Sequence, residues 1–206
     1  MIQVPGNNNL TVKNLKNRYG FTLIELIIVI AIIIILTGIA IPVSANYINE
    51  RQVYNAATQI QQDILLIQNK AITYSSSGNR FVMRFYLDSN TIAYQLTENA
   101  SPLPTSNPTP GNGIIVRKMS SSIGFPAYFG ETSPESIGIL TSPATKVTSG
   151  YIDLRFDNQG IPYWSSNGGT FTSAGGYIIL VNSSLSKQIK VEVTQIGRVK
   201  IDWITK

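Results

Sequence analysis

The side chains that most often perform catalysis or bind metals are scarce in this sequence. It contains no cysteine and no histidine, which excludes disulfide bonds, thiolate and imidazole catalysis, and the common zinc sites. The 11 acidic residues are scattered singly, whereas a catalytic site needs a nucleophile, an acid and a base close together. We therefore expect no enzyme, no cofactor and no bound metal. The most informative ionisable residue is Glu25, which lies inside an apolar segment.

Asp153, Asp157 and Asn158 offer one alternative, a calcium-binding loop. The ligand spacing of an EF-hand is missing from this stretch. Asp and Asn also favour turns, because their short side chains bond to the nearby backbone. We therefore interpret the stretch as a turn.

Glu25 carries the only charge in residues 21–43, a run long enough to cross a bilayer as a helix of about 20 residues. A charge inside a membrane span costs about 2.5 to 3.5 kcal/mol on insertion scales, so this glutamate needs a partner. Residues 1–20 are polar, have no acidic side chain and carry three cations, Lys13, Lys16 and Arg18. The positive-inside rule therefore predicts that this segment stays in the cytoplasm and that the C-terminus lies outside.

The net charge of +5 belongs mostly to that first segment, because 13 basic residues face 11 acidic ones once its three cations are set aside. A secretory signal would be cut after the apolar run, but Ile39-Ala40-Ile41-Pro42 is a poor match for an Ala-x-Ala site. The span is therefore expected to remain in the mature protein. The residues after the span are enough for one compact domain.

Residues 18–26, Arg-Tyr-Gly-Phe-Thr-Leu-Ile-Glu-Leu, resemble the processing motif of type IV prepilins and type II secretion pseudopilins. In that motif a basic leader is followed by Gly, Phe and then a Glu within the apolar run. The resemblance implies that a membrane-embedded prepilin peptidase cuts between Gly20 and Phe21 on the cytoplasmic side and methylates the new amine of Phe21. Removal of the 20-residue leader from 206 residues leaves a mature chain of 186. The alternative is a signal-anchor helix with a stray glutamate.

The physical properties of these residues fit the implied roles. Gly20 has no Cβ, so the backbone there can extend into a protease cleft without steric penalty. In a filament, the amine of Phe21 in one subunit could approach Glu25 of its neighbour, which would offset the desolvation of both charges. The implied partners are the prepilin peptidase, other pilins or pseudopilins, the inner-membrane assembly platform and, before assembly, membrane lipid.

Apolar residues continue beyond the span at spacings of four and three, which predicts an amphipathic helix. They are Val53, Ala57, Ile60, Ile64, Ile67 and Ala71. We expect a leader over 1–20, a long helix over 21–73 and an exported β-rich domain over 74–206. Within the helix, 21–43 suits the membrane or a filament core, and 44–73 suits packing on a sheet.

The remainder of the chain alternates apolar and polar residues in short runs, which predicts about seven strands. The expected pairs are hairpins over 81–96, 152–164 and 189–203, with further strands at 114–118 and 177–181. Residues 97–113 are rich in Pro and Gly and predict an exposed loop, whereas 119–150 shows no regular pattern. The fold class is therefore α+β and pilin-like, a long N-terminal transmembrane helix packed on antiparallel β-sheets.

The last third of the chain, with its strand pattern over 151–160, 177–181 and 189–199, resembles the GspH/FimT branch of minor pseudopilins and minor pilins. That resemblance implies a structural subunit of a type IV pilus, a type II secretion system or a DNA-uptake filament. The protein would cross the inner membrane once, with its C-terminal domain outside, and then enter a surface or periplasmic filament.

The alternative function is a DNA-binding or adhesive receptor at the filament tip. Some FimT-like proteins resemble DNA receptors, and Lys190, Arg198 and Lys200 concentrate positive charge near the C-terminus. Glu192 and Asp202 are interleaved with these cations, which is equally typical of an ordinary solvated hairpin.

Overall fold

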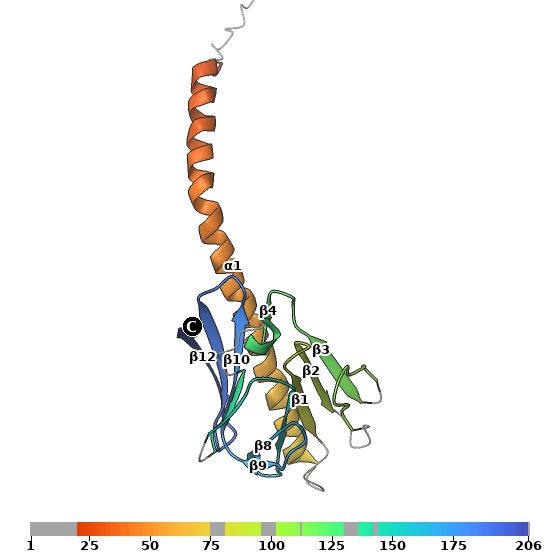
Figure 1. The fold of residues 1–206 in the computed structure, drawn as a ribbon. Helices are drawn as coiled ribbons and strands as arrows, with labels where there is room; N and C mark the ends of the chain where they lie inside the picture. The colour runs from red at the N-terminus through yellow and green to blue at the C-terminus, as the bar shows by residue number, and fades with distance from the viewer. Residues whose placement is uncertain are drawn as a thin grey trace, which may run out of the picture. The chain divides into compact units, whose positions relative to one another are not determined.

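The computed structural model describes residues 20–74, 81–95, 102–111, 113–129, 136–141 and 144–205, without the side chains of residues 40–43. Within these residues a long helix, α1 (Leu23–Thr73), precedes a series of antiparallel strands (Figure 1). Helix residues pack with both sheets in one core, so the fold is α+β and pilin-like, as predicted. Val43–Lys206 forms one compact unit, and the described residues before it belong to another.

The strands form two sheets. The first has the order β3-β2-β1-β7-β8-β9, and the second has the order β12-β11-β10-β5-β6, with β4 also paired to β10. The strands of the first sheet are β1 (Val82–Tyr86), β2 (Thr91–Gln95), β3 (Ile114–Lys118), β7 (Tyr151–Phe156), β8 (Pro162–Ser166) and β9 (Thr172–Ser173). Those of the second are β4 (Ile123–Gly124), β5 (Ile137–Ile139), β6 (Thr145–Val147), β10 (Gly176–Asn182), β11 (Lys187–Val193) and β12 (Val199–Thr205). A short 3-10 helix, η1 (Pro126–Phe129), follows β4.

The prediction of about seven strands was too low, because the described residues contain 12. The three expected hairpins are confirmed: β1 pairs with β2, β7 with β8, and β11 with β12. The additional strands are all segments of two or three residues, namely β4, β5, β6 and β9. Such segments are too short to show an alternating pattern, and they become strands only by pairing with other segments of the chain.

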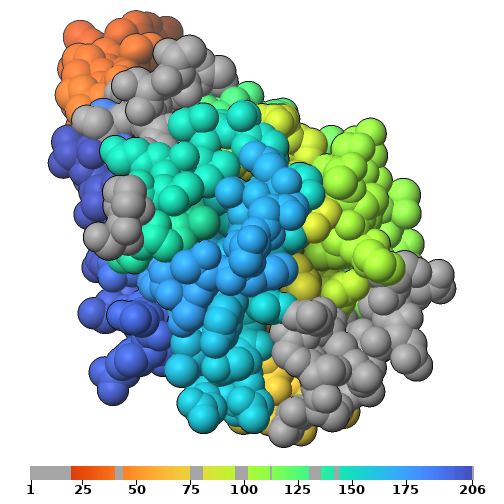
Figure 2. Space-filling view, turned by 60° about the horizontal axis from the view of Figure 1, so that its bottom comes forward, coloured from red at the N-terminus to blue at the C-terminus, as the bar shows by residue number. Residues whose placement is uncertain are grey.

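The apolar stripe of α1 forms the centre of the core. All six residues predicted for it are buried: Val53, Ala57, Ile60, Ile64, Ile67 and Ala71. They pack in one cluster with Met83 and Ile92 of the first sheet and with Ile178 and Ile189 of the second. On the face shown in Figure 2, the teal and blue segments of the later strands form the surface of the domain. Each large side chain buried in this way contributes about 1.5 to 3 kcal/mol.

Gln68 connects the helix to both sheets. Its Nε2 donates to the carbonyl oxygens of Gly160 and Gly197, each at 3.0 Å. Gly160 lies in the turn between β7 and β8, and Gly197 lies in the turn between β11 and β12. A Cβ added at Gly197 would stand 2.1 Å from the oxygen of Gly160, and φ there is +76°. Only glycine fits this contact without strain, so the helix and both sheets meet at one point.

The described part of the Pro-rich segment is held by Arg84 of β1. This guanidinium donates to the carbonyl oxygens of Leu103 at 2.8 Å and Pro104 at 2.9 Å. It also binds both carboxylate oxygens of Asp153, at 2.5 and 2.7 Å, and lies 3.9 Å from the ring centre of Tyr151. Most described residues of the segment are exposed, as expected, but Leu103 is buried. Residues 97–101 and 112 lie outside the described part.

Candidate functional site

The predicted cleavage site lies just before the first turn of α1. Gly20 and Phe21 are both exposed, Phe21 to 84%. A Cβ added at Gly20 would meet no atom within 4 Å. No contact in the described chain therefore requires glycine at position 20. If glycine is needed there, the need comes from a molecule that binds this segment, such as a protease.

Thr22 caps the helix, and Glu25 occupies its first turn. The backbone N–H of Glu25 donates to Thr22 Oγ1 at 3.3 Å, and that of Leu26 donates to the carbonyl oxygen of Thr22 at 3.2 Å. Thr-x-x-Glu is the sequence signature of a capping box, which satisfies N–H groups that lack partners within the helix. A carboxylate in the first turn also interacts favourably with the positive end of the helix dipole.

The apolar first half of α1 has no covering protein in the described chain. Its large side chains are exposed, for example Ile27 at 55%, Ile33 at 53% and Leu36 at 60%. The helix contains a window long and apolar enough to cross a membrane, and none of that window is buried. An exposed apolar surface of this extent marks contact with lipid or with other proteins. The geometry thus combines a capped, acidic first turn with an exposed apolar helix surface.

A leader motif followed by such a helix and an α+β domain is the arrangement of a membrane-anchored, pilin-like protein. Residues 15–41 match the family model described as the prokaryotic N-terminal methylation motif. Comparison with curated proteins gives no significant match. Comparison with solved structures gives none either.

The matched motif indicates a type IV pilin-like precursor that prepilin peptidase processes. It also implies assembly with other pilins, and together with the apolar helix it fits a membrane-anchored pilin. Gly20, Phe21 and Glu25 all lie within the matched residues. Their individual roles stay predictions.

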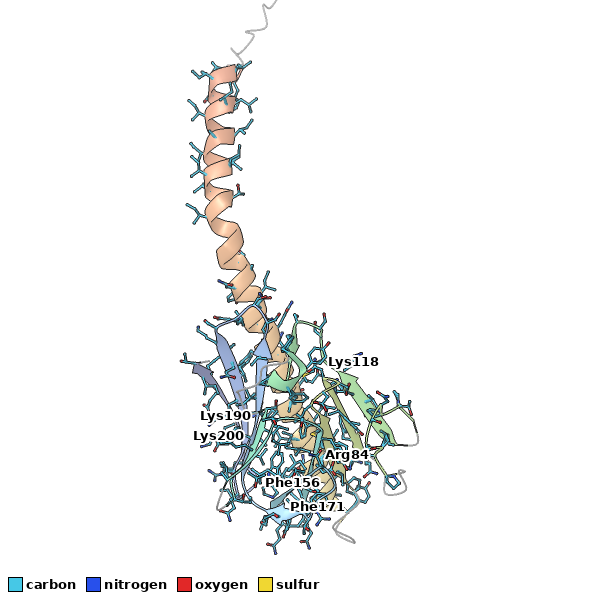
Figure 3. All side chains as sticks on the ribbon, in the orientation of Figure 1. Arg84, Lys118, Phe156, Phe171, Lys190 and Lys200 are labelled. Atoms are coloured by element: carbon cyan, nitrogen blue, oxygen red, sulfur yellow. The ribbon has the colours of Figure 1, made fainter. Side chains whose placement is uncertain are left out.

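The cations named for DNA binding lie on one hairpin, β11 and β12. Lys190 and Lys200 are close together on the second sheet (Figure 3), and Arg198 is exposed in the turn between the two strands. In the strand register Lys190 is opposite Asp202, and Lys200 is opposite Glu192. Lys190 Nζ also lies 2.9 Å from Glu192 Oε2. Each lysine thus has an acidic neighbour.

DNA binding therefore stays a prediction. Its test is salt-sensitive retention of DNA by the mature chain. Loss of retention in the double variant Arg198→Ala plus Lys200→Ala would support it.

A buried polar cluster around Asp63 was not foreseen. Asp63 is 6% exposed and accepts hydrogen bonds from Arg117 Nε at 2.8 Å and from the hydroxyl of Tyr94 at 3.1 Å. Burial raises the pKa of Tyr94, and the charge of Asp63 raises it further, although Arg117 opposes the rise. A signal was present in the sequence, because Asp63 falls on the apolar stripe between Ile60 and Ile67. An acidic residue there requires a cationic partner.

Proposed function

We propose that this protein is a minor pilin or pseudopilin of the GspH/FimT type, a filament subunit without enzymatic activity. The observation that carries the proposal is that a sequence motif and two structural features occur in the same residues. The methylation motif covers residues 15–41, and the same residues include a helix start with a capped glutamate and an uncovered apolar surface. A simple membrane anchor needs the apolar surface but not the glutamate, whose insertion costs about 2.5 to 3.5 kcal/mol.

In the proposed sequence of events, the chain inserts with its leader in the cytoplasm and its domain outside. Prepilin peptidase then hydrolyses the peptide bond between Gly20 and Phe21. The new amine on Phe21 stands next to Thr22, the helix cap, and so lies close to the positive end of the helix dipole. A neighbouring carboxylate stabilises a cationic amine at such a site more than lipid does.

Assembly would use this pairing between subunits. The Phe21 amine of an entering subunit meets Glu25 of a subunit already in the filament, and the apolar surfaces of the two helices pack together. Pairing offsets the desolvation of both charges, whereas a mismatched register leaves each charge buried without a partner. The ion pair would therefore select the axial position of each subunit.

The first test is the intact mass and N-terminal sequence of the protein recovered from membranes of cells that express a prepilin peptidase. We expect a chain that begins with methylated Phe21. The matched control is Gly20→Val, which places a branched side chain at the scissile bond and should retain the leader. A wild-type chain that still begins at Met1, despite a peptidase shown to process another prepilin in the same cells, would refute the proposal.

The second test separates insertion from assembly. Glu25→Leu should resist extraction from membranes by carbonate as well as the wild type does, because it removes the charge from the proposed membrane span. Its incorporation into filaments should fall at least tenfold, whereas Glu25→Asp, which keeps the charge, should retain part of it. Normal incorporation of the Glu25→Leu variant would contradict the assigned role of Glu25.

A further inference from the structure

An exposed aromatic groove lies within the compact unit Val43–Lys206. It has a volume of about 250 Å³ and is lined by Tyr47, Glu50, Arg51 and Tyr54 of α1 and by Trp203 of β12. The residues Tyr47, Tyr54 and Trp203 are 57%, 44% and 40% exposed. Three large aromatic side chains that remain accessible around one groove suggest a contact surface and not a part of the core.

Arg51 is the cation among the residues that line this groove, and Tyr47 fixes its orientation. Arg51 Nε donates to the hydroxyl of Tyr47 at 2.9 Å, and its Cζ lies 5.4 Å from the centre of that ring. Arg51 therefore reaches back one turn towards the start of the helix, as side chains on helices generally do. A guanidinium has five N–H donors, so the bond to Tyr47 leaves capacity for an anionic ligand.

The acidic residue of the groove is neutralised. Glu50 Oε1 accepts a hydrogen bond from Lys187 Nζ at 3.1 Å. The side chain of Lys187 is itself 56% exposed. The groove and its immediate border thus carry Arg51, Lys187 and Glu50, a net positive charge that is complementary to phosphate.

The position of the groove in the sequence indicates its partner. Tyr47 follows Val43, the last residue of the apolar run, by four positions, which corresponds to about 6 Å along a helix at 1.5 Å per residue. The polar interface of a bilayer extends about 5 to 7 Å beyond the hydrocarbon on each side. Tyrosine and tryptophan are enriched in this layer, because they combine an apolar ring with a polar edge.

We propose that this groove is a docking surface for phospholipid headgroups on the outer side of the membrane that the chain spans. Tyr47 and Trp203 insert their rings among the glycerol groups, and Arg51 binds phosphate. The surface would hold the domain against the membrane before assembly. The inference rests on the membrane span of the proposed function, but not on cleavage or on filament formation.

The two tryptophans of the chain allow a direct test. Trp203 is exposed and Trp164 is fully buried, so the Trp164→Phe variant reports on the groove and the Trp203→Phe variant reports on the core. Each full-length variant is reconstituted into phosphatidylcholine and phosphatidylglycerol vesicles, with and without a nitroxide on the lipid headgroup. We expect the nitroxide to quench Trp203 at least twofold and to leave Trp164 nearly unchanged.

Further variants test the phosphate contact. Arg51→Gln should reduce the quenching of Trp203 in vesicles that contain phosphatidylglycerol. The matched control Lys118→Gln, which removes an exposed cation from β3 on the other sheet, should not. Equal quenching in the Arg51→Gln and Lys118→Gln variants would overturn the assignment of Arg51 to phosphate.

Carbonate extraction separates failure of the inference from failure of the proposed function. If the chain stays in the membrane but Trp203 is not quenched, the docking surface is refuted. A blue-shifted, unquenched Trp203 would mean that a second copy of the chain covers the groove, which also refutes it. If carbonate removes the chain from the vesicles, the membrane span is wrong and both proposals fall.

Discussion

Asp63 shows how one side chain can hold two structural elements together. It lies on the buried face of α1 and binds Arg117 on β3, the edge strand of the first sheet. The side chain of Asp63 is 8% exposed and that of Arg117 is 33% exposed. A pair of this kind stabilises little by comparison with an apolar pair, but loss of one partner leaves the other charge buried without compensation.

We therefore predict that Asp63→Asn lowers the free energy of unfolding by about 2 kcal/mol, the usual contribution of a hydrogen bond to a charged group. The measurement is denaturant unfolding of the mature chain in detergent, followed by the fluorescence of buried Trp164. The control is Lys187→Ala, which breaks the pair with Glu50 in which the two side chains are 56% and 37% exposed. That exposed pair should contribute less than about 1 kcal/mol, and an equal effect of both variants would contradict the argument.

Tyr94 should make the free energy of unfolding fall at alkaline pH. Burial raises its pKa above the ordinary value, about 10. The folded chain then keeps this proton at pH values where the unfolded chain loses it, so the free energy of unfolding is at its full value below about pH 10 and falls as pH rises through the folded pKa. The pKa of Tyr86 is raised by burial as well, which steepens the same decline.

The test is to measure the free energy of unfolding between about pH 9 and pH 12. This interval brackets the ordinary tyrosine pKa of about 10. Tyr94→Phe should flatten the decline at the alkaline end of this interval, because the phenylalanine has no proton to lose. Tyr86→Phe should do so independently. A decline of the same slope in the wild type and in both variants would mean that neither hydroxyl is responsible.

At the scale of elements, the amphipathic half of α1 was readable from the sequence because its information is local. Spacings of four and three place the six apolar residues on one face whatever the rest of the chain does. The hairpins were readable for the same reason, since their strands are adjacent in sequence. The methylation motif is likewise contained in a short stretch, residues 15–41.

Other features depend on distant parts of the chain and could not be predicted. Arg117 is 54 residues from Asp63, and the two carbonyl groups bound by Gln68 are 92 and 129 residues away. The short strands β4, β5 and β6 exist only through pairing with β10 or with each other. The aromatic groove is lined by residues of α1 and β12, which are far apart in the sequence, so no local pattern predicts it.

Gln68 on α1 connects the helix to both sheets through its side-chain hydrogen bonds. Gln68→Ala removes the donor to Gly160 and Gly197, and we expect a loss of about 1 to 3 kcal/mol because two carbonyl groups lose their partner. Gln62→Ala is the matched control, since Gln62 is exposed on the same helix and should change stability by less than about 0.5 kcal/mol. Equal stability of the two variants would show that the bridge through Gln68 is dispensable.

At the scale of the whole molecule, the compact unit that begins at Val43 includes the second half of α1. Removal of residues 1–42 should therefore leave a folded domain with an unchanged cooperative transition. Removal of residues 1–73 also deletes Ile60, Ile64 and Ile67 from the core, each of which contributes about 1.5 to 3 kcal/mol. Because domains have only about 5 to 15 kcal/mol in total, we expect that shorter chain to show no thermal transition by calorimetry. A cooperative transition in it would contradict the central place of the helix.

The packing of the second half of α1 between the two sheets also affects how the domain would respond to force. A filament built on the first half of α1 would transmit any pull on the exposed domain along the axis of the same helix. The contacts of Val53, Ile60 and Ile67 with the two sheets would then be loaded in shear, together, and would not peel apart one after another. Contacts that must break together share the load, so a domain built in this way should resist tension better than one whose contacts break in sequence.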